Sequence, residues 1–265
     1  MIRARIFNVK YSPNLGDGLL AESLENALVE CGCDSRATYS VDLAARSSYG
    51  GQSSSGRASL LKMANALPGV VRQMLARMVL ARKRAKVWLP HYRTSLEDCD
   101  VIVIGGGNLL TDLDLNFPTK LSALINEATD RGLPIAIYGV GVSAHWSTAG
   151  LKMMRAALAP ANVVYASVRD EASKQNFDRL FGAYAGRTAE IVCDPGILVS
   201  RYVGQPQAPA QEPKSVGLGI ISAIALRYHS STKVSDRRLL AWYADIYRSI
   251  QAQGIPVHLF TNGSP

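Results

Sequence analysis

The stretch that decides the fold is residues 99–113, CDVIVIGGGNLLTDL. Its apolar run at 101–104 has no polar alternation, which is typical of a strand buried on both faces of a parallel sheet. Three glycines follow directly, and residues 108–112 lead toward a helical region. A strand that passes through glycines into a helix start offers free N–H groups and the positive end of a helix dipole. The stretch therefore predicts an anion-binding corner, with a simple tight turn as the alternative.

The same strand–loop–helix unit repeats on both sides of this corner. Apolar runs predict strands, and apolar residues at helical spacing predict the helices that follow them. The predicted strands are residues 2–9, 36–41, 101–104, 135–138, 163–168 and 191–193, and the predicted helices are residues 19–31, 118–131, 149–158 and 171–181. This alternation predicts an α/β fold with a doubly wound parallel sheet of the Rossmann-like type. Such sheets bind ligands outside the carboxyl ends of their strands.

A proline-rich stretch divides the chain. Residues 203–214, VGQPQAPAQEPK, contain three prolines and few apolar residues, which predicts a linker. The elements predicted beyond it form a single β–α–β unit: a strand from Val216, a helix at 236–252 and a strand at 257–260. We therefore expect residues 1–202 to form one domain and residues 215–265 to form the start of a second Rossmann-like domain. A lone β–α–β fragment cannot bury a doubly wound sheet, so the second domain is expected to be truncated, with an abnormally small second domain as the alternative.

The formal net charge of +8 comes from one region. Residues 43–96, a predicted insertion, contain ten Lys or Arg and no Asp or Glu. Removing these ten from the 29 basic residues leaves 19 against 21 acidic ones, a net charge of −2, which argues against a nucleic-acid-binding protein. Residues 60–89 read as an amphipathic helix with a charged end, which predicts peripheral contact with anionic lipid or a lipid-linked acidic glycan. A solvated helix end packed on the core is the alternative.

The remaining composition points to a cytoplasmic protein without a metal centre. The chain has no apolar run of about 18 residues, so no transmembrane helix is expected. Its first residues read as a strand rather than as a signal peptide. The four cysteines are scattered and lack the spacing of a zinc site, which is typical of reduced thiols in the cytoplasm.

Small and polar residues gather at the predicted carboxyl ends of the strands. The candidate site residues are Asn14, Gly16, Asp17, Gly105, Gly106, Gly107, Asn108, Ser143, Arg169 and Asp194. Two structural alternatives stay open: Asn14 or Asp17 caps the following helix, or Arg169 pairs with a neighbouring acidic residue. A nicotinamide site is disfavoured, because Leu110 stands where its glycine pattern needs the last glycine. A sugar-nucleotide glycosyltransferase built from two such domains fits better.

Five stretches together resemble the polysaccharide pyruvyl transferase family. In chain order they are NLGDGLLAESL (14–24), DVIVIGGGNLLTD (100–112), YGVGVS (138–143), VRDEAS (168–173) and CDPG (193–196). Five motifs in the right order, covering nearly all of residues 1–200, are far more specific than any one of them. The resemblance implies a GT-B-like two-domain fold. It also implies transfer of a pyruvyl group, as a ketal, from phosphoenolpyruvate to sugar hydroxyls of a bacterial surface glycan or exopolysaccharide.

The resemblance also implies roles for the candidate residues. A donor with a carboxylate and a phosphate needs a cation and oriented N–H groups. Arg169 is expected to clamp the donor and Asp17 to accept the proton of the attacking hydroxyl, with residues 105–108 lining the cleft and Asp194 orienting the acceptor. No cofactor is implied beyond the donor itself. The family has a longer second domain with a His- and Arg-bearing motif, so an inactive chain or a non-catalytic glycan-binding homologue is the alternative.

Overall fold

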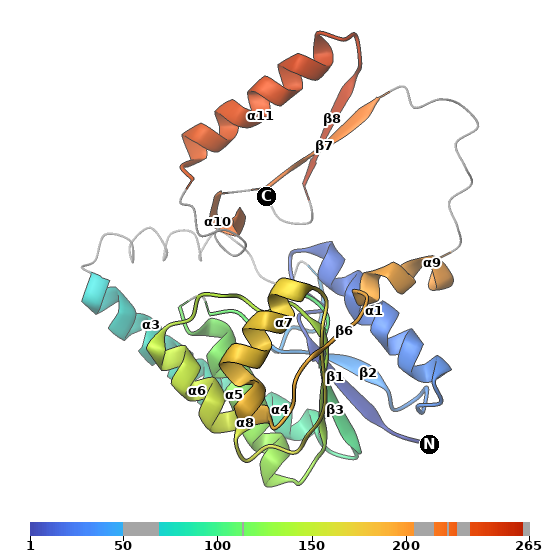
Figure 1. Ribbon diagram of the computed structural model, residues 1–265, viewed down its shortest axis with the longest axis vertical. Coiled ribbons are helices and arrows are strands. Elements are labelled where there is room, and N and C mark those ends of the chain that lie inside the picture. The colour runs from blue at the N-terminus through green and yellow to red at the C-terminus, as the bar shows by residue number, and fades with distance from the viewer. Residues whose placement is uncertain (50–68, 113, 204–214, 222, 227–233, 262–265) are drawn as a thin grey trace.

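The centre of the protein is a six-stranded sheet in which all neighbouring strands are parallel (Figure 1). The computed structural model describes residues 1–49, 69–112, 114–203, 215–221, 223–226 and 234–261. The strand order is β2-β1-β3-β4-β5-β6, with β1 at Ala4–Asn8, β2 at Tyr39–Asp42, β3 at Val101–Gly105, β4 at Ile135–Val140, β5 at Val163–Val168 and β6 at Glu190–Ile191. The predicted α/β fold with a parallel sheet is confirmed.

Helices cover both faces of the sheet (Figure 1). Leu24 of α1 packs on Val103 of β3 on one face, whereas Ile102 and Ile104 belong to the larger core on the other face, because side chains alternate along a strand. This confirms the doubly wound arrangement. The α-helices around the sheet are α1 (Leu15–Glu30), α3 (Gly69–Lys83), α4 (Leu89–Ser95), α5 (Asn116–Asp130), α6 (Thr148–Leu158), α7 (Glu171–Phe177), α8 (Ala183–Ala185) and α9 (Val199–Tyr202).

The described residues after 214 form a separate small β–α–β unit. Strands β7 (Val216–Ile220) and β8 (Val257–Thr261) are parallel, and α10 (Ala223–Leu226) and α11 (Asp236–Gln251) lie between them in the chain. Tyr243 of α11 is buried, and its hydroxyl accepts a hydrogen bond from the backbone N–H that follows β7. The predicted β–α–β unit is therefore confirmed. The predicted linker lies almost wholly outside the described residues, and the division into two domains stays a prediction.

Two helix starts differ from the prediction. The helix predicted at 19–31 begins earlier, at Leu15, so Gly16 and Asp17 lie in its first turn. The Asn14 side chain caps it there by accepting the Gly16 N–H at 3.1 Å. The helix predicted at 118–131 is α5, which begins two residues earlier, at Asn116, so the glycines do not lead directly into it. The intervening chain first forms an isolated bridge with the residues that follow β4 and then turns through two positive φ angles, 54° and 61°.

The basic region is helical from Gly69 onward. Helix α3 continues through a π-helical segment, η1 (Arg84–Trp88), into α4. Trp88 and Tyr92 are buried and Leu80 packs against the main core, so one side of this segment is fastened to the domain. The predicted loop at 46–59 and the first part of the predicted helix lie largely outside the described residues. None of the described helices combines the length and apolar character needed to cross a bilayer.

Candidate active site

Gly105, the last residue of β3, and the two glycines that follow it form the surface on which α1 lies. A Cβ on Gly105 would stand 2.7 Å from Leu24 Cδ2, and a Cβ on Gly106 would stand 3.4 Å from Leu20 Cβ. Gly106 and Gly107 also have φ angles of +81° and +74°, which residues other than glycine rarely adopt. Gly105 is thus needed for helix packing, and the bend itself is formed by the next two residues.

The helix start beside this glycine bend belongs to α1, not to the helix that follows the bend in sequence. A Cβ on Gly107 would stand 3.7 Å from Asp17 Oδ1, in the first turn of α1. Within the described part of the chain, the N–H groups of Gly107 and Asn108 donate no hydrogen bond. The predicted combination of glycine N–H groups and a helix N-terminus therefore exists, but a different helix supplies it.

The glycine bend meets the end of β4 and the end of β5 at Gly141. A Cβ on Gly141 would stand 2.6 Å from Asn108 Oδ1 and 3.0 Å from Arg169 Nη2. Both side chains therefore lie directly over the Gly141 backbone, and they bring the predicted residues Asn108 and Arg169 together. Gly141 itself was not among the predicted site residues, although it stands in the YGVGVS motif, directly after the strand next to β3.

Arg169 forms two long ion pairs, each with an aspartate. Its Nε lies 3.5 Å from Asp170 Oδ2 and its Nη1 lies 3.7 Å from Asp194 Oδ2, and the side chain is 29% exposed. The alternative of an ion pair with a neighbouring acidic residue is thus found, with Asp170. Both separations exceed those of a tight charge-assisted hydrogen bond, so the guanidinium keeps donors for a further anion.

The two aspartates are themselves fixed by helix starts. Asp170 caps α7 by accepting the Ser173 N–H at 2.7 Å, and Asp194 caps the 3₁₀ segment η3 (Pro195–Leu198) by accepting the Gly196 N–H at 2.9 Å. Burial opposes ionisation of Asp170, but the hydrogen bonds from Ser173 and the charge of Arg169 outweigh it and lower the pKa of this carboxyl. Asp170 therefore stays ionised beside the guanidinium.

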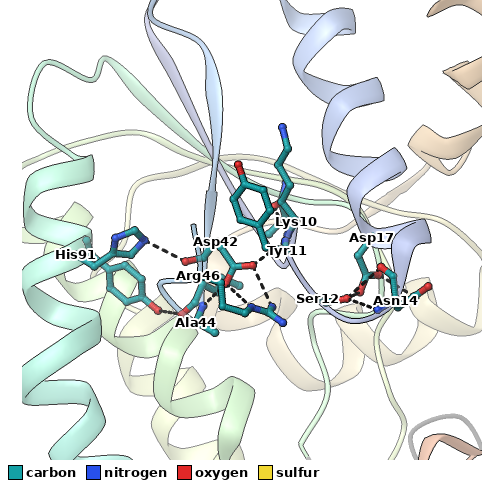
Figure 2. A network of polar contacts seen from close by, with 12 residues as sticks. Lys10, Tyr11, Ser12, Asn14, Asp17, Asp42, Ala44, Arg46 and His91 are labelled. Atoms are coloured by element: carbon teal, nitrogen blue, oxygen red, sulfur yellow. Dashed lines mark hydrogen bonds and ion pairs between the residues drawn. The ribbon is translucent and has the colours of Figure 1, made fainter. Parts of the chain in front are cut away.

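Asp17 is oriented by the loop that precedes α1 (Figure 2). Its carboxylate accepts a hydrogen bond from the Ser12 hydroxyl and one of 3.3 Å from the Asn14 side-chain amide. Ser12 also accepts the Asn14 N–H at 3.0 Å. Asn14 is the N-cap, so the capping alternative holds for Asn14. Asp17 lies one turn further, with its carboxylate near the Gly107 backbone.

A buried carboxylate, Asp42, stabilises this loop and was missed by sequence reasoning. Figure 2 shows it accepting hydrogen bonds from the N–H groups of Tyr11 and Ala44, at 3.0 and 2.8 Å, and pairing with Arg46 at 3.0 Å. The nearby Tyr92 hydroxyl donates to a backbone carbonyl, and burial raises the pKa of Tyr92 well above its usual value. The signal was an Asp at the end of a predicted strand, but the prediction ended that strand one residue too early.

Ser143 lies at the same sheet edge but bonds to structural neighbours. Its hydroxyl donates to the Thr111 hydroxyl at 2.9 Å, and its N–H donates to the Leu110 carbonyl at 2.9 Å. Asp112 accepts hydrogen bonds from both the N–H and the hydroxyl of Ser147. These contacts tie the loop after β3 to the loop after β4. Among the described residues, no hydrogen bond joins Ser143 to Arg169, and the contact of Ser143 with a substrate stays a prediction.

The sequence-predicted residues thus gather at one edge of the sheet. The glycine bend touches the first turn of α1, and Asn108 meets Arg169 over Gly141, with Asp194 at the far side of the guanidinium. Within the described residues, the arrangement offers the Arg169 guanidinium, the N–H groups of Gly107 and Asn108, and the carboxylates of Asp17, Asp170 and Asp194. Such a set can bind a small dianion and take a proton from a neighbouring hydroxyl.

Two comparisons with known proteins bear on the family of this chain. A search of curated proteins finds no match. The family model described as "Polysaccharide pyruvyl transferase" matches residues 14–261, nearly the whole chain of 265 residues. The match begins at the cap of α1, and it spans the glycine bend, Gly141, Arg169 and Asp194. The chain belongs to the polysaccharide pyruvyl transferase family.

Proposed function

We propose that the protein transfers the pyruvyl group of phosphoenolpyruvate to two hydroxyls of a sugar, forming a ketal and releasing phosphate. Membership of the family supports the transferase class. The observation that carries the donor assignment is the position of Arg169, which lies over Gly141 beside Asn108 with only long contacts to its aspartates. A donor with a carboxylate and a phosphate matches a guanidinium set next to free backbone N–H groups.

The donor is activated by protonation of its methylene carbon. The new C–H bond takes the electron pair of the C=C bond and leaves an oxocarbenium-like centre at the carbon that carries the phosphate. One sugar hydroxyl attacks this centre and loses its proton. The second hydroxyl then replaces the phosphate, whose C–O bond breaks with its electron pair, and the proton of this hydroxyl passes to the departing phosphate. Arg169 stabilises the negative charge of the donor and of the departing phosphate.

Asp17 is the proposed acceptor of the hydroxyl proton. Ser12 and Asn14 hold its carboxylate, and α1 places it beside the glycine bend. A carboxylate oriented in this way can take the proton as the sugar oxygen attacks, which avoids a high-energy oxonium. Asp194 is proposed to orient the acceptor, since its remaining surface faces the same edge as Arg169.

The sugar acceptor is proposed to belong to a cell-surface or extracellular polysaccharide that is assembled in the cytoplasm, carried on a lipid. The family name supports a polysaccharide acceptor, and the sugar identity and the linkage positions are not part of the proposal.

The test is phosphate release from phosphoenolpyruvate in the presence of an acceptor glycan. We expect release that depends on the acceptor and a new ketal on the glycan, detected by mass spectrometry. Asp17→Asn should lower turnover but leave donor binding intact, because only proton transfer is affected. Donor binding is measured as thermal stabilisation by phosphoenolpyruvate against a panel of sugar nucleotides. Stabilisation by a sugar nucleotide, with none by phosphoenolpyruvate, would reject the proposed donor.

A further inference from the structure

The exposed side of α3 and η1 combines cations with large apolar side chains, and none of them takes part in the candidate active site. The exposed cations are Arg77, Arg82, Lys83, Arg84 and Lys86. The exposed apolar side chains are Met74, Leu75, Met78, Val79 and Val87. We call these residues together the α3 surface. Met74 and Met78 are 65% and 59% exposed, which is unusual for methionine.

The cations of the α3 surface have no acidic partner among the described residues. The sequence from 69 to 96 contains no Asp or Glu, and no described acidic side chain pairs with a cation of the α3 surface. Elsewhere two cations do have acidic partners: the half-buried Lys174 pairs with Asp178 and the exposed Arg248 pairs with Asp245, both at 2.9 Å. The α3 surface therefore carries a local positive field that the rest of the described domain does not neutralise.

The apolar side chains of the α3 surface point away from the protein. Met74, Met78 and Arg82 are four residues apart, so they share one side of α3. Leu80 lies on the opposite side and packs against the core, and Trp88 is buried at the end of η1. Figure 1 shows the N-terminal end of α3 reaching past α6 at the left of the molecule. The helix is thus anchored on one side and offers the other to a partner.

We propose that the α3 surface binds the anionic face of a lipid bilayer. The methionines and the neighbouring apolar side chains enter the boundary between headgroups and acyl chains, while the arginines and lysines lie at the level of the lipid phosphates. The charge of the α3 surface favours an anionic membrane. Only cations surround its apolar side chains, and cations attract acidic headgroups. A nucleic acid would use the cations but would leave the apolar side chains in water.

The test is co-sedimentation of the full chain with lipid vesicles. Vesicles of phosphatidylcholine that contain about 30% phosphatidylglycerol present an anionic surface, and pure phosphatidylcholine vesicles are the neutral probe. We expect binding to the anionic vesicles, much weaker binding to the neutral ones, and a loss of binding at about 0.5 M salt, where charges are screened within a few ångströms. This measurement needs neither donor nor turnover, so it is independent of the proposed reaction.

Matched variants separate the α3 surface from general basicity. The triple variant Arg82→Gln, Lys83→Gln, Lys86→Gln should weaken binding roughly a hundredfold, because each cation near an anionic membrane contributes about fivefold. The variant Met74→Ser, Met78→Ser should weaken it about tenfold through lost apolar burial. The control is Arg237→Gln, Arg238→Gln, Arg248→Gln, which removes three exposed cations from α11 and should leave binding unchanged. The thermal unfolding midpoints of all three variants report whether they remain folded.

Three results would overturn the proposal. The first is the absence of binding to anionic vesicles by the wild-type chain. The second is an equal loss of binding in the α11 control, which would assign the effect to net charge. The third is binding to duplex DNA as tight as to vesicles and unaffected by Met74→Ser, Met78→Ser, which would assign the α3 surface to a polyanion.

Discussion

Arg3 and Arg169 lie at opposite edges of the same sheet and are held differently. Arg3 precedes β1 and makes a two-pronged bond to Asp100, with 2.8 Å from Nη2 and 3.2 Å from Nε. Arg169 follows β5, and its contacts with Asp170 and Asp194 are 3.5 and 3.7 Å. The donors of Arg3 are therefore committed within the protein, whereas those of Arg169 are available to another anion.

The difference shows that an arginine paired with aspartate can either have its donors satisfied within the protein or keep them available for a ligand. At the amino edge of the sheet the arginine and its aspartate satisfy each other. At the carboxyl edge the aspartates are bound to helix-start N–H groups, so they hold the Arg169 guanidinium without saturating it. Gly141 then leaves room for that guanidinium against the backbone. A structural arginine and a ligand-binding arginine are thus distinguished by geometry, and the predictions below test this distinction.

The largest effect is expected for Arg169→Lys. Lysine keeps the charge but cannot make a planar two-pronged contact with a carboxylate or phosphate. We expect turnover with phosphoenolpyruvate to fall about a hundredfold, the usual loss when one oriented donor to a developing charge is removed. Steady-state phosphate release measures the loss, and thermal stabilisation by phosphoenolpyruvate measures the weakened binding.

Arg3→Lys is the matched control for this substitution. It changes the same residue type at the other edge of the sheet, where the structure places no site residue, so activity should stay at the wild-type level. If both variants lose activity alike, or if Arg169→Lys retains full turnover, then the two arginines do not differ in the way that their geometry indicates.

The second-largest effect is expected for the pair of Arg46 and Asp42, whose carboxylate is buried and fully hydrogen-bonded. The Asp42 side chain is fully buried and holds both Arg46 and the Tyr11 N–H, so Asp42→Asn leaves the arginine without its charged partner. We expect the free energy of unfolding to fall by about 2 kcal/mol, less than for a fully buried pair because part of Arg46 reaches water. Urea denaturation measures it. Asp245→Asn, in the exposed pair with Arg248, should cause no measurable change, and an equal loss there would contradict the role of burial.

The sequence predicted the fold well because the sheet depends on local apolar patterns. The unalternated run at 101–104 did become a central strand buried on both faces. The helix after it was predicted to within two residues of its start, but the path of the chain between the glycines and that helix was not predictable, because it depends on a bridge between residues distant in sequence and on two residues with positive φ. The helix beside the glycine bend was assigned wrongly for the same reason, since only the three-dimensional packing brings α1 onto Gly106.

The candidate site was predictable where strand ends mark it, and only there. Asn108, Arg169 and Asp194 come after strands, and Asp17 lies in the first turn of the helix that follows β1. A parallel sheet must bring such positions to one edge. Asp42 was missed because its role depends on burial and on partners from two loops, those after β1 and after β2, which no local pattern reveals. Ser143 was chosen by its motif, yet its bonds go to the neighbouring loop.

A smaller effect is expected for Gly141→Ala. Its Cβ would stand 2.6 Å from Asn108 Oδ1 and 3.0 Å from Arg169 Nη2, so both side-chain ends must shift while the fold is retained. We expect the affinity for phosphoenolpyruvate to fall about tenfold, because a misplaced binding group loses much of its contribution. The double variant Gly141→Ala, Asn108→Ala removes the nearer clash and should recover part of the affinity. An unchanged affinity in the single variant would show that Arg169 does not need its present position.

The smallest effect is expected at Asp100, the saturating partner of Arg3. The hydrogen bond from the Arg3 side chain lowers the pKa of Asp100 from 3.8 to about 2. Because the folded pKa is below the ordinary value, this carboxylate contributes stability above pH 3.8, and the contribution is lost as the pH falls toward 2. The unfolding midpoints of wild type and Asp100→Asn should therefore differ slightly at neutral pH and converge at acidic pH, since the pair is exposed to solvent. Thermal melts across this pH range measure the convergence. A midpoint difference that stays constant down to pH 2 would mean that the contact between Arg3 and Asp100 does not depend on the charge of the carboxylate. The contrast between Arg3 and Arg169 would then be weaker than the distances indicate.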